Sequence, residues 1–279
     1  MAIASRKGQR WKVEEPELVG PTSKLFDRLS RRSPQSGCLL VGFDFPLGLP
    51  HQYGEKTGLT NFRTAVKEFG KGKWAKWFDV CEEKAQISLF RPFYPFRTGG
   101  TKQEYLWEAL GFTSIESILR QCEREAGACS LFWTLGGNQV GKAAISGWRE
   151  VIVPNLDKIG LWPFDGGLAE LVAKYDVVVV ETYPGDVYTR LEIPRQPGKT
   201  KQEGRKSVAD KLLKWLRTNS VEASGDLIEA LNSGFTNDDQ FDAVIGLFGM
   251  LDVVEDRQPE GNPAGSNVWE GWILGQAKE

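Results

Sequence analysis

Two apolar segments that each end in a carboxylate constrain this chain more than any other feature of its sequence. The segment CLLVGFDFP, residues 38–46, contains Asp44, and the segment DVVVVE, residues 176–181, ends at Glu181. Continuous apolar runs of this kind are typical of strands buried on both faces of a parallel sheet. Because ligands gather outside the carboxyl ends of such strands, Asp44 and Glu181 are candidate site residues.

A third acidic group begins the helix predicted at 238–254, where apolar residues recur at helical spacing. Residues three or four apart share a helix face, so Asp239 and Asp242 can point the same way. Carboxylates from three segments repel one another unless a cation lies between them, and hard oxygen ligands suit Mg²⁺ or Mn²⁺. The predicted metal ligands and catalytic residues are Asp44, Glu181, Asp239 and Asp242.

Each carboxylate also has a purely structural interpretation. Asp238 can stabilise the helix macrodipole, which is the favoured interpretation for that residue and the alternative for Asp239 and Asp242. Asp44 can instead cap the turn before a proline. Glu181 can instead form an ion pair with a nearby lysine or arginine.

Strands and helices alternate along the chain, which predicts an α/β layer architecture in one domain spanning residues 1–279. Residues of about 51–165 are rich in aromatic and basic side chains and form, in this prediction, a mostly helical insertion. A strand is also expected at 10–17, and the other expected helices are 22–33, 60–69, 73–85, 114–126, 145–156, 204–217 and 226–232.

Composition narrows the class of protein. Hydrophobic residues make up 41% and charged residues 26%, an ordinary globular balance. No apolar run approaches the ~18 residues that span a membrane, and the first residues lack the apolar centre of a signal peptide. We therefore expect a cytoplasmic protein without a membrane partner. The four cysteines show no CxxC spacing and are expected to be reduced thiols.

The net charge of −2 argues against duplex binding by the whole surface, but it is compatible with a local basic groove. The basic segment after the Glu181 strand is the favoured substrate contact, and its candidates are Lys199, Lys201 and Arg205. A second basic cluster, residues 71–76, alternates with tryptophans and suits single-stranded nucleic acid. For each cluster, a solvated helix face over core aromatics is the favoured alternative.

Two further motifs have weaker functional interpretations. The segment GGNQVGKA, residues 136–143, matches a phosphate-binding loop except that Ala143 replaces its Ser/Thr. A glycine turn is the favoured interpretation, with Lys142 near the substrate. His51 is the only histidine, and a structural or solvated role is favoured over a proton shuttle.

Four segments in order resemble a large family of uncharacterised proteins predicted to be ribonuclease H-like nucleases: GFDFPLGLP, LWPFDGG, VVVVETYPGDVY and NDDQFDAVIGLF. The resemblance covers residues 11–272, and the Asp-x-x-Asp-Ala pattern at 239–243 is similar to the last-helix motif of Holliday-junction resolvases. It implies a ribonuclease H-like central mixed sheet flanked by helices. It also implies that the four carboxylates named above bind metal.

The sequence departs from that fold in its first strand, which normally carries an Asp. Residues 4–5 and 10–11 match what should follow this Asp, but the Asp is missing before them. We expect either a start further upstream or a truncated chain. The alternative is that a metal ligand has been lost.

The leading functional hypothesis is a metal-dependent nuclease or phosphodiesterase that uses two metal ions on DNA or RNA. The second is a non-catalytic nucleic-acid-binding or scaffold protein that keeps the fold without that Asp. The third is a phosphotransferase that uses the loop 136–142.

The leading hypothesis predicts that Asp44→Asn or Asp242→Asn abolishes metal binding, because each change removes a ligand charge. Anomalous diffraction from a Mn²⁺-soaked crystal measures this directly. Nucleic-acid binding that survives both EDTA and Asp44→Asn would instead support the non-catalytic hypothesis.

Overall fold

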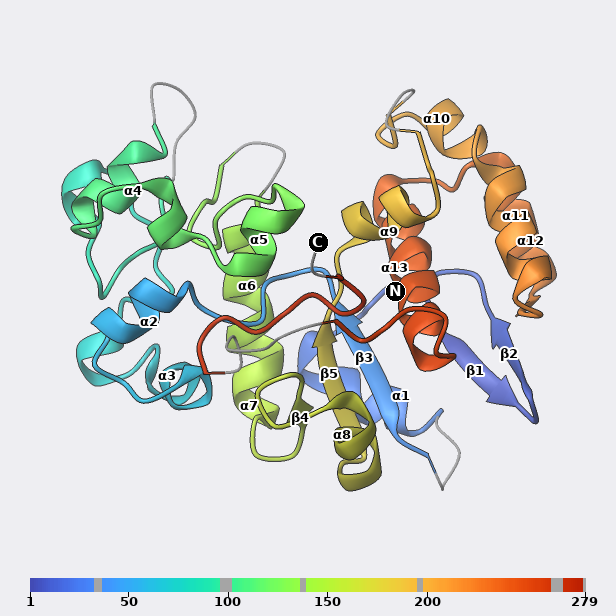
Figure 1. The fold of residues 1–279 in the computed structure, drawn as a ribbon, viewed down its shortest axis with the longest axis horizontal. Helices are drawn as coiled ribbons and strands as arrows, with labels where there is room; N and C mark the ends of the chain where they lie inside the picture. The colour runs from blue at the N-terminus through green and yellow to red at the C-terminus, as the bar shows by residue number, and fades with distance from the viewer. Residues whose placement is uncertain (33–36, 96–101, 136–138, 195–197, 262–267, 278–279) are drawn as a thin grey trace.

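The structure, a computed structural model, describes residues 1–32, 37–95, 102–135, 139–194, 198–261 and 268–277. It is a mixed α/β protein, as predicted, with many helices and two small sheets (Figure 1). The middle of the molecule holds a parallel sheet in the order β3-β5-β4. Its strands are β3 (Leu39–Phe43), β5 (Val177–Glu181) and β4 (Gly160–Leu161).

The second sheet contains the amino-terminal hairpin. Its strands are β1 (Ala4–Lys7), β2 (Arg10–Val13) and β6 (Glu222–Ala223), with β2 antiparallel to β1 and parallel to β6. The expectation of one central mixed sheet is therefore corrected, because the described strands form two separate three-stranded sheets. The hairpin packs through Trp11 and Val13 into the hydrophobic core of the C-terminal helices, away from β3 and β5.

The valines of β5 are buried on both faces, as the apolar run predicted. Val177 and Val179 belong to one hydrophobic cluster, whereas Val178 and Val180 belong to another. Alternate residues of a strand point to opposite faces, so β5 separates the two clusters. Helix α8 (Leu168–Lys174), which the sequence did not predict, contributes to the second cluster.

Helix α13 (Asp238–Val254) has the predicted bounds and packs against both α9 (Pro184–Arg190) and β3. Small residues allow this close approach. A Cβ on Gly249 would lie 2.5 Å from Val187 Cγ2, and a Cβ on Gly42 would lie 2.5 Å from Met250 Sδ. The amino end of α13 lies near the end of β3, since Asp239 and Asp242 act electrostatically on Asp44.

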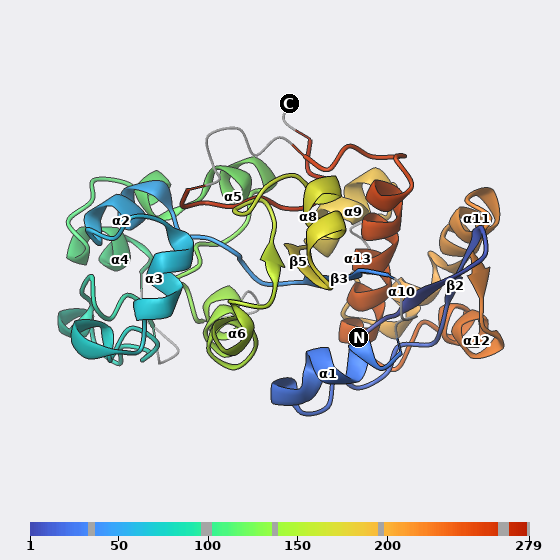
Figure 2. The ribbon, with the colours of Figure 1, turned by 90° about the horizontal axis from the view of Figure 1, so that it is seen from below.

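Residues 51–155 form the mostly helical part of the chain, which lies on the opposite side of the β3-β5-β4 sheet from α11 and α12 (Figures 1 and 2). Its α-helices are α2 (His51–Lys56), α3 (Phe62–Glu68), α4 (Glu104–Ala109), α5 (Gln121–Ala126), α6 (Val140–Gly147) and α7 (Val153–Asn155), with the π-helix η5 (Trp148–Ile152) between the last two. The described residues of this part also form the 3-10 helices η2 (Gly72–Trp74), η3 (Lys84–Gln86) and η4 (Ile115–Ile118).

The prediction of a helix at 73–85 is wrong, since that range contains only parts of the 3-10 helices η2 and η3. Aromatic packing decides its conformation. The ring of Trp77 stacks on Phe69, with centroids 3.8 Å apart, and also on Trp148, at 5.5 Å. Such contacts bury large side chains without a regular helix.

The remaining helices are η1 (Thr22–Lys24), α1 (Leu25–Ser30), α10 (Gln202–Lys206), α11 (Ala209–Thr218) and α12 (Gly225–Ser233). Several predicted helices are shorter or divided: α1 ends at Ser30, 114–126 is split between η4 and α5, 145–156 among α6, η5 and α7, and 204–217 between α10 and α11. None of the described helices has both the length and the apolar character needed to cross a bilayer.

The C-terminal segment, residues 268–277, returns to the middle sheet. Ile273 forms a parallel bridge with Glu181, and the Leu274 N–H donates to the Glu181 carbonyl at 2.9 Å. The Glu270 carboxylate accepts the backbone N–H groups of His51 (3.1 Å) and Gln121 (3.0 Å). This segment therefore connects the sheet with the first residues of α2 and α5.

Candidate functional site

Asp44 follows the last residue of β3 and keeps a solvent-exposed side chain. The protein around its carboxyl group nevertheless displaces much of the water, and this desolvation is the largest cause that raises the pKa of Asp44 to about 7. Nearby carboxylates add to the rise and a nearby ammonium opposes it. These neighbours are Asp242, Lys199, Glu181 and Asp239. The structure thus brings the predicted carboxylates within electrostatic range of Asp44.

Both carboxylate oxygens of Asp242 are hydrogen-bonded. The Tyr188 hydroxyl on α9 donates to Oδ1, and the Lys199 ammonium donates to Oδ2. Lys199 Nζ also lies 5.4 Å from the centre of the Tyr188 ring. The Asp242 side chain is only 17% exposed, whereas that of Lys199 is 41% exposed. A lysine therefore neutralises this predicted ligand in the structure.

Tyr188 directs the Asp242 carboxylate. Desolvation, the charge of Asp242 and their shared hydrogen bond raise the pKa of Tyr188 far above its ordinary value, so the hydroxyl stays protonated as a donor. The Tyr188 ring stacks on Phe241 at 5.8 Å, which fixes its orientation. The packing of α9 against α13 thus sets the geometry of Asp242.

Arg205, predicted to contact substrate, is buried and has a structural role instead. Its guanidinium donates to the carbonyls of Lys199 (2.6 Å), Gly234 (2.7 Å) and Phe235 (3.3 Å). These bonds tie the Lys199 backbone to the connection between α12 and α13. Lys201, two residues after Lys199, is exposed at the start of α10. Of the three predicted basic contacts in this segment, Lys199 is the one that interacts with the acidic residues.

Asp239 lies exposed in the first turn of α13. Asn237 caps this helix, because its side chain accepts the Gln240 N–H at 2.9 Å. Asp239 acts electrostatically on Asp44 and on the amino group of Met1. The capped first turn therefore places Asp239 on the same side of the molecule as the β3 end.

Glu181 has the structural role that the alternative interpretation described, an ion pair with an arginine. Arg120 Nη1 and Nη2 each lie 2.7 Å from a Glu181 carboxylate oxygen, and the Leu47 N–H donates to the same carboxylate at 2.7 Å. Arg120 also bonds Glu123 Oε1 at 3.0 Å. Glu181 is 4% exposed and Arg120 is fully buried, so these partners leave Glu181 little freedom to bind a metal.

Two important residues of this region were missed by the sequence prediction. Arg120 stands three residues before Glu123, a spacing typical of a helix start, but nothing local reveals its distant partner Glu181. Tyr188 follows the segment TYPGD, for which no helix was predicted, although α9 begins within it at Pro184. The helical spacing between Pro184 and Tyr188 was the available signal.

The donor chemistry of Asp44, Asp239 and Asp242 suits a hard divalent cation, because all three offer carboxylate oxygens. Desolvation is the main cause of the raised pKa of Asp44, and the charges of Asp242, Glu181 and Asp239 add to it. Their present arrangement is not that of a formed metal site, since the described residues contain no group of three or more acidic, histidine or cysteine side chains able to hold an ion. Binding a cation would require these carboxylates to turn and the Lys199 ammonium to leave Asp242.

The other predicted residues lie elsewhere. Lys142 is exposed on α6, and residues 136–138 of the glycine motif lie outside the described residues. His51 begins α2 and lines a pocket of about 380 Å³ with Arg124 and Glu270. In the basic cluster 71–76, Lys73 lies over the ring of the buried Trp74 at 5.4 Å, which agrees with a solvated face over core aromatics.

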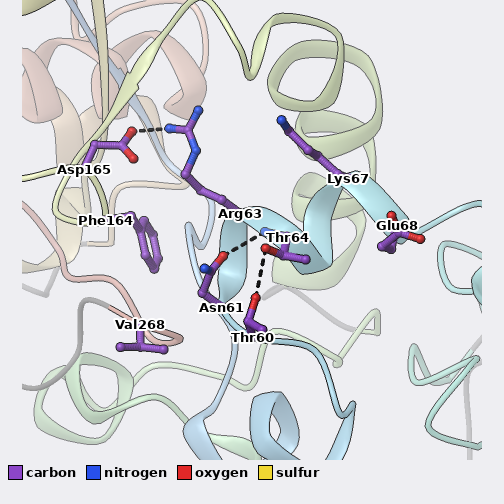
Figure 3. Close-up of a pocket in the computed structure, with 9 residues that line it drawn as sticks. All are labelled: Thr60, Asn61, Arg63, Thr64, Lys67, Glu68, Phe164, Asp165 and Val268. Atoms are coloured by element: carbon purple, nitrogen blue, oxygen red, sulfur yellow. Dashed lines mark hydrogen bonds and ion pairs between the residues drawn. The ribbon is translucent and has the colours of Figure 1, made fainter.

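A larger pocket of about 590 Å³ lies at the start of α3 (Figure 3). Arg63 there forms an ion pair with Asp165, and the Asn61 side chain accepts the Thr64 N–H at 2.9 Å. None of the residues that line this pocket is a predicted site residue. The acidic cluster of Asp44, Asp239 and Asp242 is thus distinct from both of these pockets.

In metal-free buffer, Asp44→Asn is expected to stabilise the protein more at pH 8 than at pH 5. The pKa of Asp44 in the folded protein, about 7, lies above the ordinary value of 3.8. At pH values between these two, unfolding therefore releases a proton. The stability of the wild-type protein therefore falls as pH rises through this window, and the variant lacks this loss. Urea unfolding at both pH values measures it, with exposed Asp79→Asn as control. An equal effect of Asp44→Asn at both pH values contradicts the assignment.

Glu181→Gln is expected to lower the free energy of unfolding by roughly 3 kcal/mol, because it removes one of the two buried carboxylates that compensate the Arg120 charge. The matched control is Glu108→Gln, which removes an ion pair with Lys84. The side chain of Glu108 is 53% exposed and that of Lys84 is 52% exposed. That change should cost less than about 1 kcal/mol. Urea denaturation separates the two. Similar losses in both variants would remove the structural role assigned to Glu181.

The comparisons with known proteins supply no relative for this chain. No family model matches it, and neither a curated protein nor a solved structure matches it significantly. The resemblance to ribonuclease H-like nucleases therefore depends on the quoted motifs alone, and the interpretation of the acidic cluster depends on its own geometry.

Proposed function

We propose that this protein is a divalent-cation-dependent phosphodiesterase that acts on nucleic acid, DNA or RNA. One observation carries the proposal. The carboxylates of Asp239 and Asp242, in the first turns of α13, lie close enough to Asp44 at the end of β3 to add to the desolvation that raises its pKa to about 7. Carboxylate oxygens gathered in this way are the ligands that Mg²⁺ and Mn²⁺ prefer.

Asp44, Asp239 and Asp242 are the residues proposed to hold the cation, Mg²⁺ or Mn²⁺. When bound, that cation would neutralise the carboxylates and polarise a phosphate oxygen of the substrate. Glu181 is left out of this ligand set because Arg120 engages both of its oxygens. The quoted motifs, together with the parallel β3–β5 pair beside α13, support a ribonuclease H-like core as part of the same proposal.

The chain's own residues have separate roles in this proposal. The Tyr188 hydroxyl orients Asp242, and its protonated state keeps it a donor. The ammonium of Lys199 supplies positive charge beside the carboxylates, where a phosphate group would bind. Lys142 stays a more distant candidate for contact with the nucleic acid.

A second candidate function is a non-catalytic nucleic-acid-binding or scaffold protein. The ion pair between Lys199 and Asp242 favours it, because a lysine can satisfy this carboxylate permanently without a metal. The two functions differ in their dependence on cations. Binding to an oligonucleotide that is unchanged by EDTA and by Asp44→Asn, without any hydrolysis, would favour the scaffold.

Asp44→Asn and Asp242→Asn are each expected to reduce hydrolysis at least about 100-fold, since loss even of groups that support metal ligands costs 10–100-fold. The measurement uses single-stranded DNA and RNA oligonucleotides and bis(p-nitrophenyl) phosphate with Mn²⁺. Asp79→Asn serves as the exposed control. Hydrolysis that persists in EDTA, or in both Asn variants, would contradict the proposed function.

A further inference from the structure

The Lys199 side chain is a cation in direct contact with one of the proposed ligands. Its ammonium forms an ion pair with Asp242 and also acts electrostatically on Asp44. It lies against the face of the Tyr188 ring, 5.4 Å from its centre. One positive charge therefore contacts or influences two of the three carboxylates proposed to bind a divalent cation.

The backbone of Lys199 is held firmly, although its side chain is not. Buried Arg205 donates to the Lys199 carbonyl at 2.6 Å and, through the same guanidinium, to the Gly234 carbonyl at 2.7 Å. The Lys199 side chain is 41% exposed and has a flexible four-carbon stem. Its ammonium can therefore leave Asp242 by rotation alone, while the backbone stays attached to the α12–α13 connection.

We propose that Lys199 is a built-in counter-cation that competes with the divalent cation for Asp242. Without metal, its ammonium compensates the acidic cluster. Metal binding displaces it toward solvent, where it becomes available to a substrate phosphate. This inference rests on the proposed function, because it needs a divalent cation at Asp44, Asp239 and Asp242.

Two measurable consequences follow from like-charge repulsion. A neutral side chain at position 199 removes the charge that competes with the divalent cation. The affinity for that cation should therefore rise at least about tenfold, because two charges ~4 Å apart near a protein surface interact with several kcal/mol. The same change leaves the carboxylates uncompensated in metal-free buffer. The variant should then unfold at a lower temperature without metal and gain more from added Mn²⁺ than the wild-type protein gains.

The experiment measures Mn²⁺ binding by isothermal titration calorimetry in wild type, Lys199→Met and Lys199→Gln. Lys201→Met is the matched control, because it removes the same charge two residues away from an exposed position. Thermal unfolding with EDTA and with Mn²⁺ provides the second readout. Tighter Mn²⁺ binding in the folded position-199 variants, with Lys201→Met within about threefold of wild type, supports the inference; that control limit follows from solvent screening.

The other outcomes separate this inference from the proposed function. Equal Mn²⁺ affinity in wild type and both Lys199 variants overturns the counter-cation and leaves the metal site intact. An equal gain in Lys201→Met also overturns it, since the effect is then general surface charge. Absence of Mn²⁺ binding in every variant overturns both the inference and the proposed function.

Discussion

The buried ion pair between Arg120 and Glu181 is the interaction on which the rest of the structure depends. Arg120 comes from the start of α5, and Glu181 ends β5, so the pair joins the helical part of the chain to the middle sheet. The same guanidinium reaches the carbonyl of Glu270 at 3.1 Å. A buried pair of this kind gains little net stability over apolar packing, but losing one partner is severe. It therefore fixes how these three segments fit together.

This pairing also divides the carboxylates at the strand ends into two kinds. Glu181 is buried, with its charge satisfied by Arg120 and the Leu47 N–H, and it maintains the position of the β5 end. Asp44, at the end of the adjacent strand, is exposed and has no comparable compensation. Residues of the same chemical type on neighbouring strands thus differ in role because their surroundings differ.

The sequence allowed the strongest elements to be predicted. The apolar runs gave β3 and β5, and the helical spacing gave α13 with its bounds, because burial on one or all faces leaves a regular pattern. The separation into two sheets was not predictable, since it depends on which core the amino-terminal hairpin joins. The conformation around Trp77 also depends on distant aromatic partners rather than on local periodicity.

The carboxylates of the candidate site were predictable from the sequence, but their partners were not. Strand ends and a helix start identified Asp44, Asp239 and Asp242, and the structure brings them within electrostatic range. Their partners were not identifiable, because Lys199 and Arg120 are 43 and 61 residues away in sequence from the carboxylates they bind. Pairing at such separations leaves no local pattern.

The C-terminal segment has a consequence for how the molecule is made. Its Ile273 lies alongside the end of β5, and Glu270 holds the beginnings of α2 and α5. During synthesis on the ribosome, β5 and both helices emerge long before these residues. The nascent chain must therefore keep the end of β5 and the starts of α2 and α5 without these partners until residues 268–277 have left the exit tunnel.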